Sequence, residues 1–184
     1  MANPVYPTIG PNLVWIDLEM TGPNPIKHAI IQIATLITDE NLDVIAEGPE
    51  IIVHQSEEVL DNIWPDAKRI FNGTGFIDEV RKSRVSLKEA EKKTLDFVSK
   101  HCEYHTAPLC GNSVHVDRAF LKLYMPDLDE YFHYRNIDVT AFKEAKRMWY
   151  PEVEPFVKDK KHQALDDIKI SIAELQYYRE KILK

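Results

Sequence analysis

The chain of 184 residues lacks most of what marks a secreted or membrane protein. Its two cysteines, Cys102 and Cys110, are too few for a disulfide framework, so we expect two small buried thiols and a reducing compartment. No apolar run approaches the roughly 20 residues that cross a bilayer, so we expect no membrane association. The first eleven residues show no signal-peptide or transit-peptide pattern, and we expect a flexible segment over residues 1–11. These absences favour the cytoplasm, although a removed presequence would leave a mitochondrial location open.

Basic residues are also fewer than acidic residues. The chain has 23 Lys and Arg against 30 Asp and Glu, a net charge of −7. Long nucleic acids usually bind to a basic surface, from which counterions are released. Because this chain is acidic, we expect no long-duplex nucleic acid as a partner. The simpler explanation of the charge is that an acidic surface aids solubility.

The order of apolar runs indicates the fold class. The length suits one domain over residues 1–184. Apolar runs predict strands over residues 13–18, 30–37 and 45–54, separated by Asp39-Glu40-Asn41 and by Gly48-Pro49. The remaining pattern predicts short strands at 108–110 and 135–139 and helices over 86–100, 116–124, 140–149 and 163–183, the first with a capping box of Ser86 and Glu89. Hairpin-spaced strands with interleaved helices predict an α/β domain whose mixed central sheet is flanked by helices.

Two acids stand at the end of the first predicted strand. Asp17 and Glu19 are two residues apart, so their side chains project to the same face. Carboxylates pressed together repel unless a cation neutralises them, which favours a metal site. The alternative is a pair of solvated strand-end acids.

Further candidate groups lie where two helices begin. Asp117 follows the loop 111–113, where a helix N-terminus favours any negative charge. His162 is followed by Asp166 and Asp167, which are equally consistent with helix capping. Helical spacing alone does not choose between the two aspartates.

These acids and the histidine all lie at element boundaries, where side chains can converge on one cleft edge. Carboxylate oxygens suit Mg²⁺ or Mn²⁺, and two such ions about 3.5–4 Å apart assist phosphoryl transfer. A histidine with an ordinary pKa of about 6.5 can take a proton from the attacking water. The residues therefore predict a two-metal hydrolase of phosphodiesters.

Four segments of the chain resemble the signature segments of the DEDDh exonucleases and, among them, the oligoribonucleases. They are residues 14–22 (VWIDLEMTG), 110–118 (CGNSVHVDR), 132–139 (FHYRNIDV) and 162–168 (HQALDDI), and the resemblance extends from Leu13 to Lys184. It implies an RNase H-like exonuclease fold. It also implies the following roles: metal binding by Asp17, Glu19, Asp117 and Asp167, with His162 as general base. Asp167 is chosen over Asp166 because the family pattern places the last acid five residues after the histidine.

The same resemblance implies a homodimeric 3′-to-5′ exoribonuclease that releases nucleoside 5′-monophosphates from RNA of about two to five nucleotides. Met20, Trp64 and Ser113 would contact substrate, while Tyr134 and Arg135 would reach the partner's active site. The simpler roles are a half-buried surface aromatic for Tyr134, a strand-edge charge for Arg135 and loop hydrogen bonding for Ser113.

The segments that would cradle the substrate depart from the family pattern. Pro23 stands where the family has leucine, and Gln32 where it commonly has glutamate. Trp64 is displaced by about two positions, and Phe71 occupies the place of a histidine. Both aromatics are open to two interpretations, base stacking or core packing.

Two other functions stay open on this evidence. A related DEDDh nuclease acting on longer RNA or on DNA 3′ ends fits the altered cradle. A catalytically silent RNA-binding protein fits the fold, but the presence of all five candidate catalytic residues argues against it.

Overall fold

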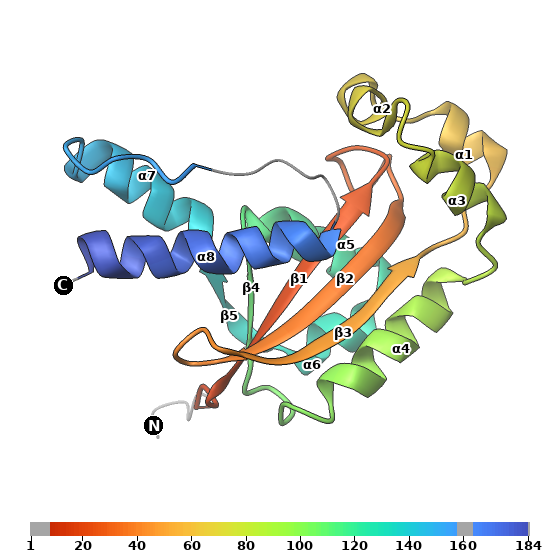
Figure 1. Ribbon diagram of the computed structural model, residues 1–184. Coiled ribbons are helices and arrows are strands. Elements are labelled where there is room, and N and C mark those ends of the chain that lie inside the picture. The colour runs from red at the N-terminus through yellow and green to blue at the C-terminus, as the bar shows by residue number, and fades with distance from the viewer. Residues whose placement is uncertain (1–7, 158–163, 184) are drawn as a thin grey trace, which may run out of the picture.

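The computed structural model describes residues 8–157 and 164–183, and its centre is a mixed sheet of five strands (Figure 1). The strands are β1 (Asn12–Met20), β2 (Ile30–Asp39), β3 (Val44–Ile52), β4 (Pro108–Gly111) and β5 (His133–Asp138), in the spatial order β3-β2-β1-β4-β5. β1, β2 and β3 pair antiparallel, whereas β4 runs parallel to both β1 and β5. The predicted α/β fold with a mixed sheet is confirmed.

Eight helices surround the sheet within the described residues. They are α1 (Glu57–Asp61), α2 (Pro65–Phe71), α3 (Phe76–Lys82), α4 (Leu87–Val98), α5 (Val114–Tyr124), α6 (Pro126–Tyr131), α7 (Val139–Trp149) and α8 (Ala164–Ile182). α4, α5 and α6 cover one face, α8 crosses the other face beside α7, and α1 to α3 gather where β1 ends (Figure 1). No helix among these residues is long and apolar enough to span a bilayer.

The central strand β1 is buried on both sides along most of its length. Val14, Ile16 and Leu18 belong to the core beneath α4 and α5, while Leu13 and Trp15 pack against α8. Alternation places Asp17 and Glu19 on the α8 side, directly beyond these two apolar residues. The same pattern that packs α8 onto the sheet thus presents two carboxylates near its beginning.

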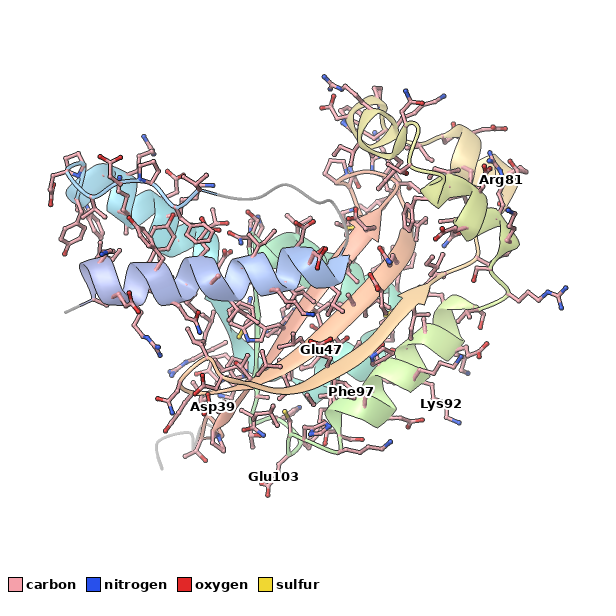
Figure 2. The ribbon with its side chains drawn as sticks, in the orientation of Figure 1. Asp39, Glu47, Arg81, Lys92, Phe97 and Glu103 are labelled. Atoms are coloured by element: carbon pink, nitrogen blue, oxygen red, sulfur yellow. The ribbon has the colours of Figure 1, made fainter. Side chains whose placement is uncertain are left out.

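The third strand corrects one expectation. Gly48-Pro49 does not separate two elements but lies inside β3, where the register to β2 shifts in a bulge. Proline is tolerated there because β3 is an edge strand. Gly48 is required because a Cβ would lie 2.5 Å from the Phe97 ring of α4, which packs under the strand (Figure 2).

Local chemistry accounts for the element boundaries. Ser86 caps α4 by accepting a hydrogen bond from the Glu89 amide at 3.2 Å, as predicted. Val139, expected to end a strand, instead begins α7, because the Asp138 carboxylate accepts the Thr140 amide and caps that helix. Cys102 and Cys110 are both buried free thiols, as expected.

Candidate active site

Three carboxylates meet on the α8 side of the sheet. Ligand oxygens of Asp17, Glu19 and Asp167 all lie within 4.8 Å of one another, and all three side chains are partly buried. Like charges this close repel strongly unless they are protonated or neutralised by a cation. An all-oxygen carboxylate set of this kind fits a divalent cation such as Mg²⁺ or Mn²⁺.

The way α8 packs brings Asp167 into this group. Ile168 and Ile172 anchor the helix in the same core cluster as Trp15, and Asp167 lies in its first turn. Asp166 is not part of this group, since neighbouring helical positions differ by about 100°. It acts on Lys169, whose pKa is raised chiefly by its hydrogen bond to Glu47 and also by the charge of Asp166. The structure therefore brings the second of the two candidate aspartates to Asp17 and Glu19.

Asp117 approaches the group from the other side of β1. β4 ends at Gly111, so the edge of β1 beyond Ile16 has no strand neighbour on that side and α5 takes its place. Asp117 is 6% exposed, and its Oδ1 accepts a hydrogen bond from the Leu18 amide at 3.1 Å. The carboxylate is thereby held against the backbone segment that joins Asp17 to Glu19, beside the three-carboxylate group.

Burial makes these carboxylates hard to ionise without a cation. It raises the pKa of Glu19 from 4.5 to about 7, with the charges of Asp167 and Asp117 adding to the effect. Burial also raises the pKa of Asp117 from 3.8 to about 7, although the Leu18 amide opposes the shift. A bound cation would have the opposite effect on these carboxyl groups, because it favours their ionised forms.

The raised pKa of Glu19 predicts that the stability of the fold depends on pH. Because the folded-state pKa of Glu19 lies above its ordinary value, the folded chain holds an extra proton between about pH 4.5 and pH 7. The metal-free fold therefore loses stability as pH rises through that window. We expect Glu19→Gln to be more stable than the parent at pH 8, by on the order of 3 kcal/mol, and equal to it near pH 4.5. Calorimetric unfolding with chelator at both pH values measures this, and equal stabilities at pH 8 would contradict it.

A cavity of about 260 Å³ opens beside Glu19. Gln32 lies directly across from Glu19 on β2, and its Nε2 donates to Glu50 Oε1 at 3.1 Å. Phe71 lines the cavity but is only 8% exposed and packs with Leu60. Of the two interpretations of Phe71, the structure supports a core aromatic whose edge borders the cavity.

Trp64 comes to the end of β1 despite its displaced position in the sequence. Its amide donates to the Thr21 carbonyl at 2.7 Å, and its ring stands edge-on to His28 with centroids 6.1 Å apart. The side chain is 47% exposed, so a face of the indole is accessible. Met20, half-buried at the bulge that ends β1, lies directly before Thr21.

Ser113 is held by the start of α7. It adopts a left-handed backbone conformation with φ of 52°, and its amide donates to Asp138 Oδ1 and Thr140 Oγ1, both at 2.9 Å. Ser113 directly precedes α5, which carries Asp117.

Tyr134 and Arg135 are not brought to the carboxylates of their own chain. In the strand pairing, His133 lies opposite Pro108 and Leu109 lies opposite Val14. Tyr134 and Arg135 therefore lie toward the end of the parallel strands that is away from Asp17. At about 3.3 Å per residue and 4.8 Å per strand, they lie roughly 10 Å along the strands and roughly 10 Å across them from Asp17. Tyr134 is 50% exposed, with the Arg135 guanidinium 5.3 Å from the centre of its ring.

The expected general base, His162, lies outside the described residues. Sequence reasoning missed a partly buried polar network that joins the end of β4 to α7 and α8: Asn112, Thr140, Ser171 and Glu174 are linked by hydrogen bonds. The available signal was Glu174, a charged residue flanked by the apolar core positions of α8.

A mixed sheet whose central strand ends in paired carboxylates, met by a third acid from one helix and a fourth from another, defines the class of RNase H-like exonucleases. Solved exonuclease I structures confirm the fold. The zinc-bound Escherichia coli exonuclease I complex with single-stranded DNA superposes with a TM-score of 0.73 at 16% identity, covering 95% of this chain and 42% of that chain. The exonuclease I of Methylocaldum szegediense superposes with a TM-score of 0.72 at 20% identity, covering 94% of this chain and 41% of that chain. This chain thus spans about two fifths of their length.

Sequence comparison narrows the class. The RNase T exonuclease family matches residues 14–175. The oligoribonuclease of Shewanella loihica is 51% identical over 174 residues, and those of Haemophilus influenzae strain PittGG and Escherichia coli K12 are each 49% identical; each alignment covers 94% of this chain and 96% of the relative. The chain belongs to the oligoribonuclease family.

Proposed function

We propose that this protein is a 3′-to-5′ exoribonuclease that hydrolyses RNA of about two to five nucleotides to nucleoside 5′-monophosphates. The observation that carries the proposal is the meeting of Asp17, Glu19 and Asp167 within 4.8 Å, with buried Asp117 against the same strand. These four carboxylates would hold two Mg²⁺ or Mn²⁺ ions, which would supply the positive charge that stabilises the attacking and leaving oxygens. His162 takes the proton from the attacking water.

The rigidity of β1 supports this assignment. Two of the four acids lie on a strand that pairs with β2 from Asn12 to Met20, and a third is tied to the backbone of that strand, so their spacing is fixed before any ligand arrives. Met20, Trp64 and Ser113 contact the substrate around this centre. In this proposal residues 1–184 form one exonuclease domain that acts in the cytoplasm.

The surroundings of the site favour a short substrate. The cavity beside Glu19 has a volume of about 260 Å³, below the roughly 300 Å³ at which small-ligand pockets begin, so it is too small for several nucleotides at once. The net charge of −7 offers little attraction to a long polyanion. Both observations favour recognition of a chain end over recognition of a long strand.

A length series tests the proposal. With Mn²⁺ or Mg²⁺, we expect turnover per 3′ end to be highest on RNA of two to five nucleotides and to fall on a fifteen-nucleotide RNA and on matched DNA. Faster turnover per end on the longer RNA or on DNA would favour the related nuclease. Binding without any mononucleotide release would favour a silent RNA-binding protein.

The position of Tyr134 and Arg135 supports a homodimer. Both are exposed and lie away from the carboxylates of their own chain, so in this proposal they serve the site of a second copy. There the tyrosine stacks on a base and the arginine pairs with phosphate. We expect Tyr134→Ala to lower kcat/KM on a dinucleotide by about 10- to 100-fold, because base stacking is worth about 1–3 kcal/mol.

Mixed dimers test this exchange. When Tyr134→Ala and Asp167→Asn chains exchange subunits, each heterodimer has one site with every group present, so activity should recover to about a quarter of the parent's. Asp117→Asn mixed with Asp167→Asn is the matched control, because every site then lacks one acid. Failure of the first mixture to exceed its components, with exchange verified by mass, would show that Tyr134 does not act across the dimer.

A further inference from the structure

A side-chain amide joins three elements around the carboxylate group. Asn112 follows β4, and its Nδ2 donates to Ser171 Oγ at 2.7 Å and to Glu174 Oε2 at 3.2 Å, both on α8. Its Oδ1 accepts from Thr140 Oγ1 at 3.3 Å, at the start of α7. Ser171 is 7% exposed and Glu174 is 1% exposed, so the bonds to α8 are shielded from solvent.

The donors and acceptors of this network leave one arrangement. The Ser171 hydroxyl gives its single proton to the Asp167 carbonyl at 2.8 Å, so it must accept from Asn112. Glu174 accepts from the Tyr178 hydroxyl through Oε1, and its Oε2 receives the second proton of the Asn112 amide. Asn112 therefore presents both donors to α8 and its acceptor to α7. An aspartate has no donor to offer and would face Glu174 with a like charge.

The network ends at a backbone atom of a site residue. Ser171 lies one helical turn after Asp167 and is bonded to its carbonyl. The same loop that carries Asn112 leads through Ser113 into α5 and Asp117. The Asn112 side chain is thus bonded to the helix that carries Asp167, and its backbone leads directly into the helix that carries Asp117.

We propose that Asn112 is a positioning residue, whose amide fixes the first turns of α8 so that Asp167 reaches the Asp17 and Glu19 carboxylates. This inference rests on the proposed function of that site. Hydrogen-bond partners of metal ligands typically change metal affinity by 10- to 100-fold when removed; Asn112 acts through Ser171 on the Asp167 backbone, so we expect an effect at the lower end of that range.

Manganese titration calorimetry of the purified chain tests the proposal without relying on turnover. We expect Asn112→Ala to bind Mn²⁺ at least about tenfold more weakly than the parent. Its kcat on a dinucleotide should fall even at saturating metal, because Asp167 is then misplaced relative to Asp17 and Glu19. Asn112→Asp should bind Mn²⁺ no more tightly than Asn112→Ala, although aspartate has the same shape as asparagine. Adding Glu174→Gln to Asn112→Asp should restore part of the Mn²⁺ affinity, since the amide donor then lies on residue 174.

Gln176→Ala is the matched control, because it removes a hydrogen bond from the same helix, to the Leu42 carbonyl, away from the network. If Asn112→Ala binds Mn²⁺ as tightly as this control, the positioning role is overturned. Should Asn112→Ala fail to fold, Ser171→Ala removes the partner of the 2.7 Å bond and decides by the same comparison. A parent chain that neither binds Mn²⁺ nor releases mononucleotides would instead overturn the proposed function.

Discussion

Asp167→Asn is expected to lower kcat on a dinucleotide by about a thousandfold, whereas Asp166→Asn leaves it within about threefold of the parent. A thousandfold loss corresponds to about 4 kcal/mol of transition-state stabilisation, the scale on which a preorganised charged group acts. The two variants make the same chemical change at adjacent positions of α8. Only Asp167 has a carboxylate oxygen within 4.8 Å of those of Asp17 and Glu19.

Steady-state kinetics and Mn²⁺ calorimetry on both variants provide the measurement. Asp167→Asn should weaken Mn²⁺ binding, because an amide oxygen carries less negative charge than a carboxylate. If Asp166→Asn is the inactive variant instead, the first turn of α8 presents its other face to the site and the assignment of Asp167 is wrong.

His162→Ala is expected to lower kcat by about 10²- to 10⁴-fold, the usual contribution of a general base, while Mn²⁺ binding stays close to that of the parent. The contrast with Asp167→Asn separates proton transfer from metal binding. The pH dependence adds a second readout. The parent's kcat should fall as pH drops below the pKa of the base, and the residual activity of the variant should lose that limb of the profile.

His54→Ala is a suitable control, because this exposed histidine lies outside the carboxylate group. Equal loss of Mn²⁺ binding and kcat in His162→Ala would indicate a role in holding the metal in place of a role as base.

The sheet and the longer helices could be predicted because their apolar patterns are long. β1 and β2 each contain a continuous apolar run bounded by polar residues, and α4 carries apolar positions at helical spacing. α1, α2 and α3 span five to seven residues, too few for a period to be read. α6 begins at Pro126, which the sequence correctly marks as the end of α5. What restarts the helix there is a long-range contact, in which the Glu91 carboxylate accepts the amides of Asp127 and Leu128.

The site residues also divide into those that the sequence predicts and those that it does not. Strand alternation alone places Asp17 and Glu19 together. The family resemblance selects Asp167 over Asp166, but helical spacing does not, because the physical choice depends on the rotation of α8 and hence on how Ile168 and Ile172 pack. The burial of Asp117 could not be predicted, because it depends on β4 ending before β1 does. Asn112 gave no local signal, since its partners Ser171 and Glu174 lie about 60 residues further along the chain.

The central claim is that four carboxylates on β1, α5 and α8 hold a pair of divalent cations. Anomalous diffraction from crystals grown with Mn²⁺ tests it most directly. We predict two manganese peaks about 3.5–4 Å apart, ligated by Asp17, Glu19, Asp117 and Asp167. Crystals saturated with Mn²⁺ that show no peak within ligand distance of Asp17 and Glu19 would contradict it.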